Sequence, residues 1–283
     1  MNRSSARARV ICPICGADGL RVVFHYDAPP KGETIFEFSN SSEYRREIHQ
    51  CASCGHFVSR MDDNLSKLYE GQYVEATYGK SGLFETYSRI MALPVEKSDN
   101  YYRVQRIIEY TEPFVTSGKF SQPKPTVLDV GSGLCVFLKR MKSIGWLGTA
   151  LDPDQKAVDH ALSNVGVEAV CGDFMLMSSL GAYDLITFNK VLEHVEDPVA
   201  MLSKSHNFLN SAGMIYIELP DGQASAVMGK DREEFYIEHL HIFSLTSLGI
   251  LADLAGFTVL QAECIHEPSD KYTVYGFLAP KHD

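Results

Sequence analysis

Strand-like apolar runs alternate with helix-like segments through the second half of the chain. Short runs rich in β-branched and other apolar residues cover residues 126–130, 147–151, 167–170, 185–188 and 214–218. Helical patterns cover residues 137–144, 155–164 and about 198–208. Because strands joined by helices pair in parallel and are covered on both faces, this alternation predicts an α/β fold with a parallel sheet.

The end of the chain departs from that alternation. Residues 258–264 and 272–278 are two strand-like runs joined by a turn, with no helix between them. Two strands joined so closely pair in an antiparallel hairpin. The whole pattern therefore predicts a Rossmann-like, mostly parallel sheet of seven strands that ends in an antiparallel hairpin.

The first 125 residues lack the strand–helix alternation of the rest of the chain. Residues 1–60 are rich in turns and hold two Cys-x-x-Cys pairs, whereas residues 61–120 read as helical. A glycine and two prolines within residues 117–125 indicate a linker. We therefore predict a metal-binding module over residues 1–60, a helical connector or lid over 61–120, and the α/β domain over 121–283.

Composition narrows the class of partner. The 283 residues are 45% hydrophobic and 22% charged, as in a globular protein, with a formal net charge of −10. That charge argues against nucleic acid and anionic membranes as main partners. No apolar run approaches the roughly 20 residues needed to span a bilayer, and the basic start lacks the apolar core of a secretory signal. We expect a cytoplasmic protein.

The two cysteine pairs are Cys12/Cys15 and Cys51/Cys54, each followed by glycine. Thiolates three residues apart can hold one metal from a tight turn, and two such turns complete a tetrahedral site. In a reducing compartment this pattern favours structural Zn²⁺ over disulfides. Two redox-active or merely buried pairs are the alternative, and His49 or His56 could replace one cysteine as a ligand.

Acidic side chains end the first two strands of the α/β segment. The sequence VLDVGSG places Asp129, Gly131 and Gly133 before a helix, and LDPD places Asp152 after the next strand. Glycines let the backbone approach a ligand, and an acid after the second strand can accept the hydroxyls of a ribose. A nicotinamide site would need a third glycine at position 136, where the chain has Val136.

Four motifs in order, VLDVGSG, LDPD, CGDF and YDLITFNKVLEHVEDP, resemble those of class I S-adenosylmethionine-dependent methyltransferases over about residues 124–283. The resemblance implies that Asp129, Gly131 and Gly133 hold the methionine end of S-adenosyl-L-methionine. It further places Asp152 at the ribose, Asp173 at the adenine amine, Phe174 beside the adenine ring and Asn189 on the path to the methyl group. One departure is Cys135, where many members have glycine.

The stretch EFYIEHLHIFS, with the N-terminal cysteine pairs, resembles the nucleotide-sugar C-methyltransferases of deoxysugar pathways. The sequence alone leaves open whether this stretch is a strand or a loop. The resemblance implies that Tyr236, Glu238 and His239 line a sugar pocket. His239 would be the base that removes a proton beside a 4-keto group, and His194 would orient the acceptor. An alternative is structural, with Ser244 as the N-cap of the next helix.

The sequence thus predicts a methyltransferase that acts on a nucleotide-linked keto sugar by base-assisted C-methylation. O-methylation of a surface-polysaccharide sugar or natural product is the alternative, and RNA or protein methylation, with the zinc module as a docking site, is a third possibility. The resembling enzymes carry a further C-terminal domain, whereas the sequence given ends at Asp283. We therefore expect part of the sugar pocket to be missing or to be supplied by a partner subunit, as in a homodimer.

Overall fold

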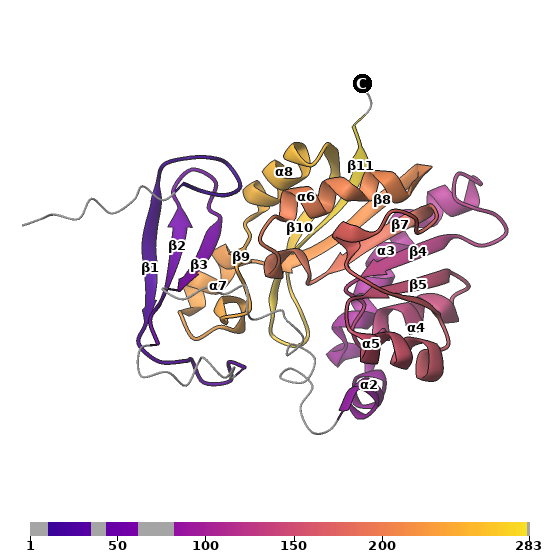
Figure 1. Ribbon diagram of the computed structural model, residues 1–283, viewed down its shortest axis with the longest axis horizontal. Coiled ribbons are helices and arrows are strands. Elements are labelled where there is room, and N and C mark those ends of the chain that lie inside the picture. The colour runs from indigo at the N-terminus through magenta and orange to yellow at the C-terminus, as the bar shows by residue number, and fades with distance from the viewer. Residues whose placement is uncertain (1–10, 35–43, 62–81, 282–283) are drawn as a thin grey trace, which may run out of the picture.

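A computed structural model describes residues 11–34, 44–61 and 82–281. It contains two sheets that lie side by side, with α7 (Gly222–Met228) between them and β9 (His241–Ile242) as an edge strand of the smaller sheet (Figure 1). Within the described residues no helix combines the length and apolarity that crossing a membrane requires.

The larger sheet has seven strands in the order β10-β11-β8-β7-β4-β5-β6. Its parallel strands are β4 (Thr126–Val130), β5 (Leu147–Asp152), β6 (Glu168–Cys171), β7 (Tyr183–Asn189) and β8 (Leu209–Pro220). Strands β10 (Phe257–His266) and β11 (Tyr272–Pro280) form the antiparallel hairpin, and β11 pairs antiparallel with β8. The predicted mostly parallel sheet with a terminal hairpin is confirmed.

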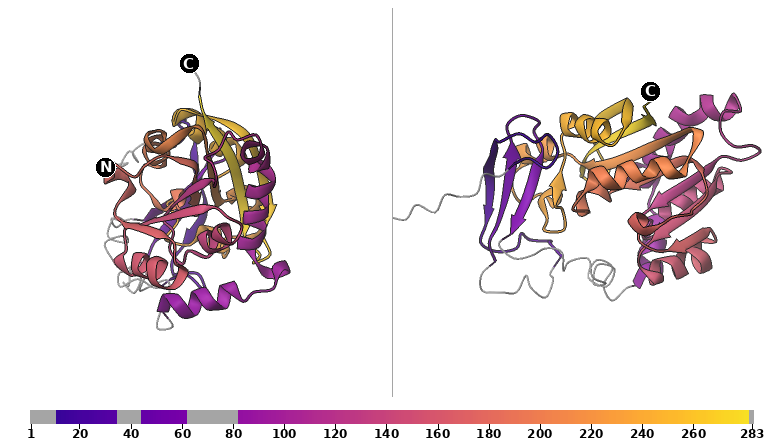
Figure 2. Two further views of the ribbon diagram at one scale, coloured as in Figure 1. Left: turned by 90° about the vertical axis from the view of Figure 1, so that its right-hand side faces the viewer. Right: turned by 45° about the horizontal axis from the view of Figure 1, so that its top comes forward.

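Helices cover both faces of this sheet (Figure 2). One face packs against α3 (Asp99–Thr116), α4 (Val136–Ser143) and the segment formed by α5 (Gln155–His160) and η5 (Ala161–Val165), and α2 (Gly82–Met91) packs on α4 and α5. The other face packs against α6 (Pro198–Lys204) and α8 (Leu245–Leu254). The strands read as continuous apolar runs because both of their faces are buried.

The smaller sheet has the order β1-β2-β3-β9 and is antiparallel. Strands β1 (Leu20–Tyr26), β2 (Arg46–Cys51) and β3 (Phe57–Met61) come from the N-terminal module, whereas β9 lies more than 170 residues further along the chain. The module therefore shares a sheet with the segment that directly follows His239.

Ser244 joins the cysteine pairs to the large domain. Its side chain caps α8 in a reciprocal capping box with Ser247 and also donates a hydrogen bond of 2.6 Å to the carbonyl of Cys54. Buried cysteines of the module belong to the same apolar cluster as Leu248 of α8. The predicted helix cap at Ser244 is therefore also a docking contact.

The helical prediction for residues 61–120 is confirmed over α2 and α3, while its first part, residues 62–81, lies outside the described residues. Two arginines of α3 form a buried ionic cluster with Glu218 at the end of β8. Arg103 Nε lies 2.8 Å from Glu218 Oε2, and Arg106 Nη2 lies 2.6 Å from Glu218 Oε1. These ion pairs attach α3 to the edge of the sheet at which the parallel strands end.

Candidate active site

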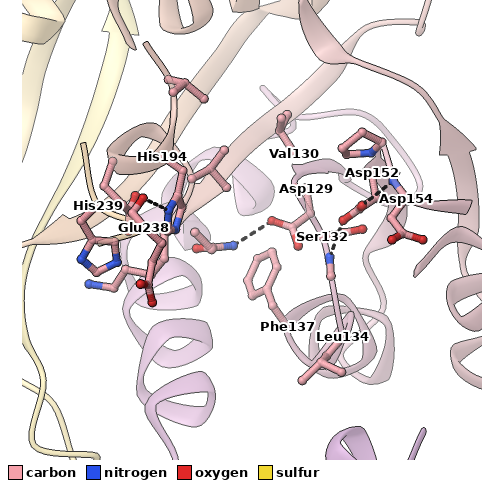
Figure 3. Close-up of a pocket in the computed structure, with 18 of the residues that line it drawn as sticks. Asp129, Val130, Ser132, Leu134, Phe137, Asp152, Asp154, His194, Glu238 and His239 are labelled. Carbon is pink, nitrogen blue, oxygen red and sulfur yellow. Dashed lines mark hydrogen bonds between the residues drawn. The ribbon is translucent and has the colours of Figure 1, made fainter. Parts of the chain in front are cut away.

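A cavity of about 1280 Å³ opens at the carboxyl ends of the parallel strands. Figure 3 shows its two sides: Asp129, Ser132, Asp152 and Asp154 lie on one side, and His194, Glu238 and His239 lie across from them. Open α/β sheets bind their ligands at this edge. The structure thus brings the two groups of residues that the sequence singled out into one cavity.

Asp129 ends β4 with only 3% of its surface exposed. Its carboxylate accepts hydrogen bonds from Thr187 Oγ1 at 2.6 Å and Asn189 Nδ2 at 2.8 Å. Burial raises the pKa of Asp129 to about 6, and these two hydrogen bonds oppose that rise. A cationic ligand near this carboxylate would offset the cost of its burial.

Asp152 holds the loop that follows β4. One of its oxygens accepts from the backbone N–H of Gly133 at 2.8 Å, and the other accepts from the N–H of Asp154 at 2.9 Å. Burial raises the pKa of Asp152, and these two hydrogen bonds oppose that rise. A carboxylate oxygen has two lone pairs, so each oxygen can still accept one hydroxyl of a diol.

The loop between β4 and α4 has three residues with positive φ: Gly131 at 67°, Gly133 at 47° and Cys135 at 54°. A Cβ on Gly131 would meet Val191 at 2.8 Å, so glycine is also sterically required there. Cys135 precedes α4 in the left-handed conformation, which is unfavourable for a residue with a side chain. This backbone conformation explains why glycine suits position 135. The side chain of Cys135 is buried and packs in the core.

Asp173 and Phe174, which follow β6, also line the cavity. Asp173 is exposed and accepts a hydrogen bond from the N–H of Met175 at 2.8 Å. Phe174 lines the cavity, but its ring is 3% exposed and packs against Phe188 and Phe208 in the core. The predicted contacts of Asp173 and Phe174 with an adenine stay predictions.

Two polar atoms on this side have no hydrogen-bond partner among the described residues. They are Ser132 Oγ and Asn189 Oδ1, both buried and both on residues that line the cavity. Buried polar atoms are normally paired. Together with the glycine loop and the two carboxylates they fit a polar ligand, and Ser132 is a contact that the sequence analysis missed.

The opposite side is built by the stretch from Glu234 to His241, which is mostly loop. It begins with the short helix η9 (Glu233–Phe235) and reaches β9 through turns. His239 Nδ1 lies 2.9 Å from the carbonyl of Glu234, and His194 Nδ1 lies 2.8 Å from the carbonyl of Glu238. These bonds hold the two imidazole rings with their centroids 5.0 Å apart.

Burial lowers the pKa of His194 and lowers that of His239 well below its ordinary value. Both rings are therefore neutral at pH 7 and able to accept a proton. Glu238 lines the same cavity, and burial raises its pKa. Tyr236 also lines the cavity, although its hydroxyl donates to the carbonyl of Lys31 at 3.0 Å. His241 lies outside the cavity's lining and instead contacts His56, with 3.1 Å between His241 Nδ1 and His56 Nε2.

The N-terminal module fixes this loop through a buried ion pair. Arg46 and Glu33 have fully buried side chains and lie 2.8 Å apart. Arg46 Nη1 donates to the carbonyl of Phe235 at 2.5 Å, and Glu33 Oε1 accepts from the N–H of Ile237 at 2.8 Å. Because Arg46 is buried and paired, it is not part of a nucleic-acid-binding surface.

The four cysteines converge. Cys12 Sγ lies 3.7 Å from Cys54 Sγ, Cys15 Sγ lies 3.6 Å from Cys51 Sγ, and all four sulfurs lie within 4.8 Å of one another. A tetrahedron of Zn–S bonds of about 2.3 Å has sulfurs about 3.8 Å apart. The cluster therefore fits a metal ion. His49 instead contacts Glu47, and His56 contacts His241, so neither replaces a cysteine.

Comparison with known proteins agrees with this arrangement. The family described as "Methyltransferase domain" matches residues 98–262, more than half of the chain. Among curated proteins, the ubiquinone biosynthesis O-methyltransferase of Caulobacter vibrioides is 27% identical over 99 residues, which are 32% of this chain and 39% of that protein. Its counterpart from Glaesserella parasuis is 28% identical over 124 residues, 40% of this chain and 51% of that protein. The chain thus spans about half or less of these relatives.

Two solved structures share the fold. Magnesium protoporphyrin IX methyltransferase from Synechocystis, with bound S-adenosylhomocysteine, aligns with a TM-score of 0.56 at 15% identity, over 76% of this chain and all of that one. The 1,6-didemethyltoxoflavin-N1-methyltransferase of Burkholderia thailandensis, also with S-adenosylhomocysteine, gives 0.51 at 14% identity, over 82% of this chain and 98% of that one. At such identities the likeness concerns the fold alone.

Proposed function

The chain belongs to the methyltransferase domain family, and we propose that it transfers the methyl group of S-adenosyl-L-methionine to a small-molecule acceptor, a nucleotide-linked keto sugar. The observation that carries this proposal is the single cavity in which Asp129 and Asp152 face His194, Glu238 and His239. A donor held by the two aspartates would point its reactive end toward the two histidines.

On the donor side, the residues fit the cofactor as the motifs imply. Asp152 would accept the ribose hydroxyls, and Asp129 with Gly131 and Gly133 would hold the methionine end, whose ammonium group suits a buried carboxylate. Asp173 and Phe174 would contact the adenine, and Asn189 would line the path to the methyl group. S-adenosylmethionine, when bound, supplies a methyl group that its sulfonium already activates, so the chain must chiefly align and deprotonate the acceptor.

Asp152→Ala is expected to weaken binding of S-adenosylhomocysteine by about tenfold or more, because a hydrogen bond to a charged group contributes about 1.5–3 kcal/mol. Isothermal titration calorimetry measures the change. Asp159→Ala, at an exposed position on helix α5, which follows β5, is the matched control and should bind like the wild type. Equal affinity in Asp152→Ala and the control would remove Asp152 from the cofactor site.

On the acceptor side, His239 would accept the proton that the acceptor loses. Its neutral ring is oriented by the carbonyl of Glu234, as described above. His194 would orient the acceptor, and Glu238 and Tyr236 would complete the pocket wall. C-methylation needs such a base because carbon attacks only after a proton beside the carbonyl has left.

His239→Gln is expected to lower turnover by at least about 100-fold, since a positioned general base contributes 10²–10⁴-fold. Binding of S-adenosylhomocysteine should be unchanged, because His239 lies across the cavity from the aspartates. Transfer from methyl-labelled S-adenosylmethionine gives the rate, and His25→Gln, a half-exposed histidine of β1, is the control. Turnover near the wild-type rate in His239→Gln would exclude His239 as the base.

O-methylation is the second candidate, and the similarity to ubiquinone biosynthesis O-methyltransferases favours it. The same histidine could remove a proton from a hydroxyl group. We also propose that Cys12, Cys15, Cys51 and Cys54 hold a structural Zn²⁺, which supplies no chemistry to the reaction. Free thiols in such a cluster suit the reducing conditions of the cytoplasm.

A further inference from the structure

A buried carboxylate lies beside the two histidines. Glu193 belongs to the short helix η7 (Leu192–His194), is 0% exposed, and lines the cavity. Neither of its carboxylate oxygens has a hydrogen-bond partner among the described residues. One such oxygen and a ring nitrogen from each of His194 and His239 all lie within 4.8 Å of one another. An unpartnered acid in this position needs an explanation, because buried acids are normally paired.

The hydrogen bond of His239 shows which of its two ring nitrogens can accept a proton. Its Nδ1–H donates to the carbonyl of Glu234, which fixes the tautomer and leaves Nε2 as the nitrogen that can accept a proton. Once protonated there, the ring would be a cation in a buried site. A carboxylate within a few ångströms is the group that stabilises such a cation best.

The charges around Glu193 distinguish a proton-accepting group from a metal ligand. Burial raises its pKa to about 7, Lys190 and Lys271 lower it, and Glu218 raises it. The same two lysines also disfavour positive charge on His239. Positive charge on Lys190 and Lys271, which also line the cavity, would oppose the entry of a divalent cation, although the three ligand types would suit one. The surroundings thus favour a carboxylate that exchanges a proton near neutral pH.

We propose that Glu193 is the partner of His239 in deprotonating the acceptor. His239 Nε2 takes the proton of the acceptor's C–H or O–H bond, and the electron pair of that bond remains on the acceptor. The ionised Glu193 then stabilises the imidazolium and receives its proton, which leaves to solvent. This inference rests on the proposed methyl transfer for the identity of the reaction, whereas the pairing of Glu193 with His239 can be tested without any acceptor.

The first test uses Glu193→Gln in the ligand-free protein. In the wild type, the ring signals of His239 in ¹⁵N NMR should shift near pH 7, where the neighbouring Glu193 loses its proton, and this shift should be absent from the variant. A carboxyl group whose pKa is higher in the folded than in the unfolded protein lowers the free energy of unfolding as the pH rises from about 4.3 toward 7. The Tm of Glu193→Gln relative to the wild type should therefore rise between pH 5 and pH 8. His239 ring signals that follow the same course in both proteins near pH 7, with a pH-independent Tm difference, would overturn the pairing.

The second test measures turnover with S-adenosylmethionine and a nucleotide-linked 4-keto sugar. We expect Glu193→Gln to lower kcat by about 10- to 100-fold with little change in KM, and to displace the acid limb of the pH profile. Glu193→Asp should retain part of the rate, and Glu168→Gln, at an exposed position on β6, should retain all of it. A wild-type kcat and pH profile in Glu193→Gln would contradict the proposal.

Two further outcomes distinguish this inference from a failure of the proposed substrate and from a metal site. If the wild type does not methylate the sugar, the proposed substrate fails, while the NMR and Tm results still decide the pairing of Glu193 with His239. If calorimetry with Mn²⁺ or Zn²⁺ finds one divalent ion bound beyond the cysteine cluster, and Glu193→Gln abolishes that binding, the three residues are a metal site and the proton-accepting role is wrong.

Discussion

If the four-cysteine cluster holds the proposed Zn²⁺, removal of that metal is expected to unfold the N-terminal sheet and to abolish turnover. Structural zinc supplies about 10–16 kcal/mol of apparent binding free energy in small domains, more than a short antiparallel sheet can replace. The loss should reach the active site, because Ser244 binds the carbonyl of Cys54 and β9 pairs with β3. The donor half of the cavity, built on β4 and β5, should persist.

Metal analysis of freshly purified protein should find about one equivalent of zinc, and Cys12→Ser should lose it. Circular dichroism and S-adenosylhomocysteine binding, before and after chelation, separate loss of the module from loss of the whole fold. Cys264→Ser is the matched control, since Cys264 is exposed on β10 and lies outside the cluster. No metal in the wild type, or a fold that chelation leaves intact, would contradict the zinc site.

Arg46→Ala is expected to lower the free energy of unfolding by about 3–5 kcal/mol, because it leaves the buried Glu33 carboxylate without its cation. Burial raises the pKa of Glu33, and Arg46 opposes that rise. In the variant that pKa rises further, so Glu33 can avoid the penalty by staying protonated at low pH. The destabilisation should therefore be larger at pH 8 than at pH 5. Urea denaturation at both pH values measures it, with Arg60→Ala at an exposed position on β3 as the control.

The double variant Arg46→Met/Glu33→Gln separates stability from positioning. It removes both buried charges and should recover part of the lost stability. Turnover should stay low, because the carbonyl of Phe235 lacks its donor and the loop that carries His239 is no longer fixed. Wild-type turnover in the double variant would show that the ion pair stabilises the fold without positioning the histidine.

The α/β half of the fold could be predicted from local sequence. Its strands are buried on both faces and read as short apolar runs, and the helices between them carry clear polar faces. The glycine loop and the acids Asp129 and Asp152 could also be identified in the sequence. The turn after β4 requires glycine for its backbone conformation, and the two acids stand where parallel strands end, which is where such sheets bind their ligands. The convergence of the two cysteine pairs follows from their spacing.

The conformation of the stretch that carries His239 could not be predicted from its own residues. It is a loop because Glu33 and Arg46, about 200 residues earlier, bind its backbone, and because β3 supplies the strand that pairs with β9. Glu193 was missed for a related reason. A glutamate beside a histidine normally lies on the surface, and only the tertiary structure shows that both of its oxygens are buried beside two imidazoles.

The most direct test of the central claim is methyl transfer itself. The purified protein is incubated with methyl-labelled S-adenosylmethionine and a panel of nucleotide-linked 4-keto sugars and ordinary nucleotide sugars, and cofactor binding is confirmed in the same sample. The account predicts label on a carbon beside the keto group. Label on a hydroxyl oxygen would leave the methyltransferase and its base in place but replace C-methylation by O-methylation. No labelled product from any member of the panel, with the cofactor bound, would contradict the proposed sugar acceptor.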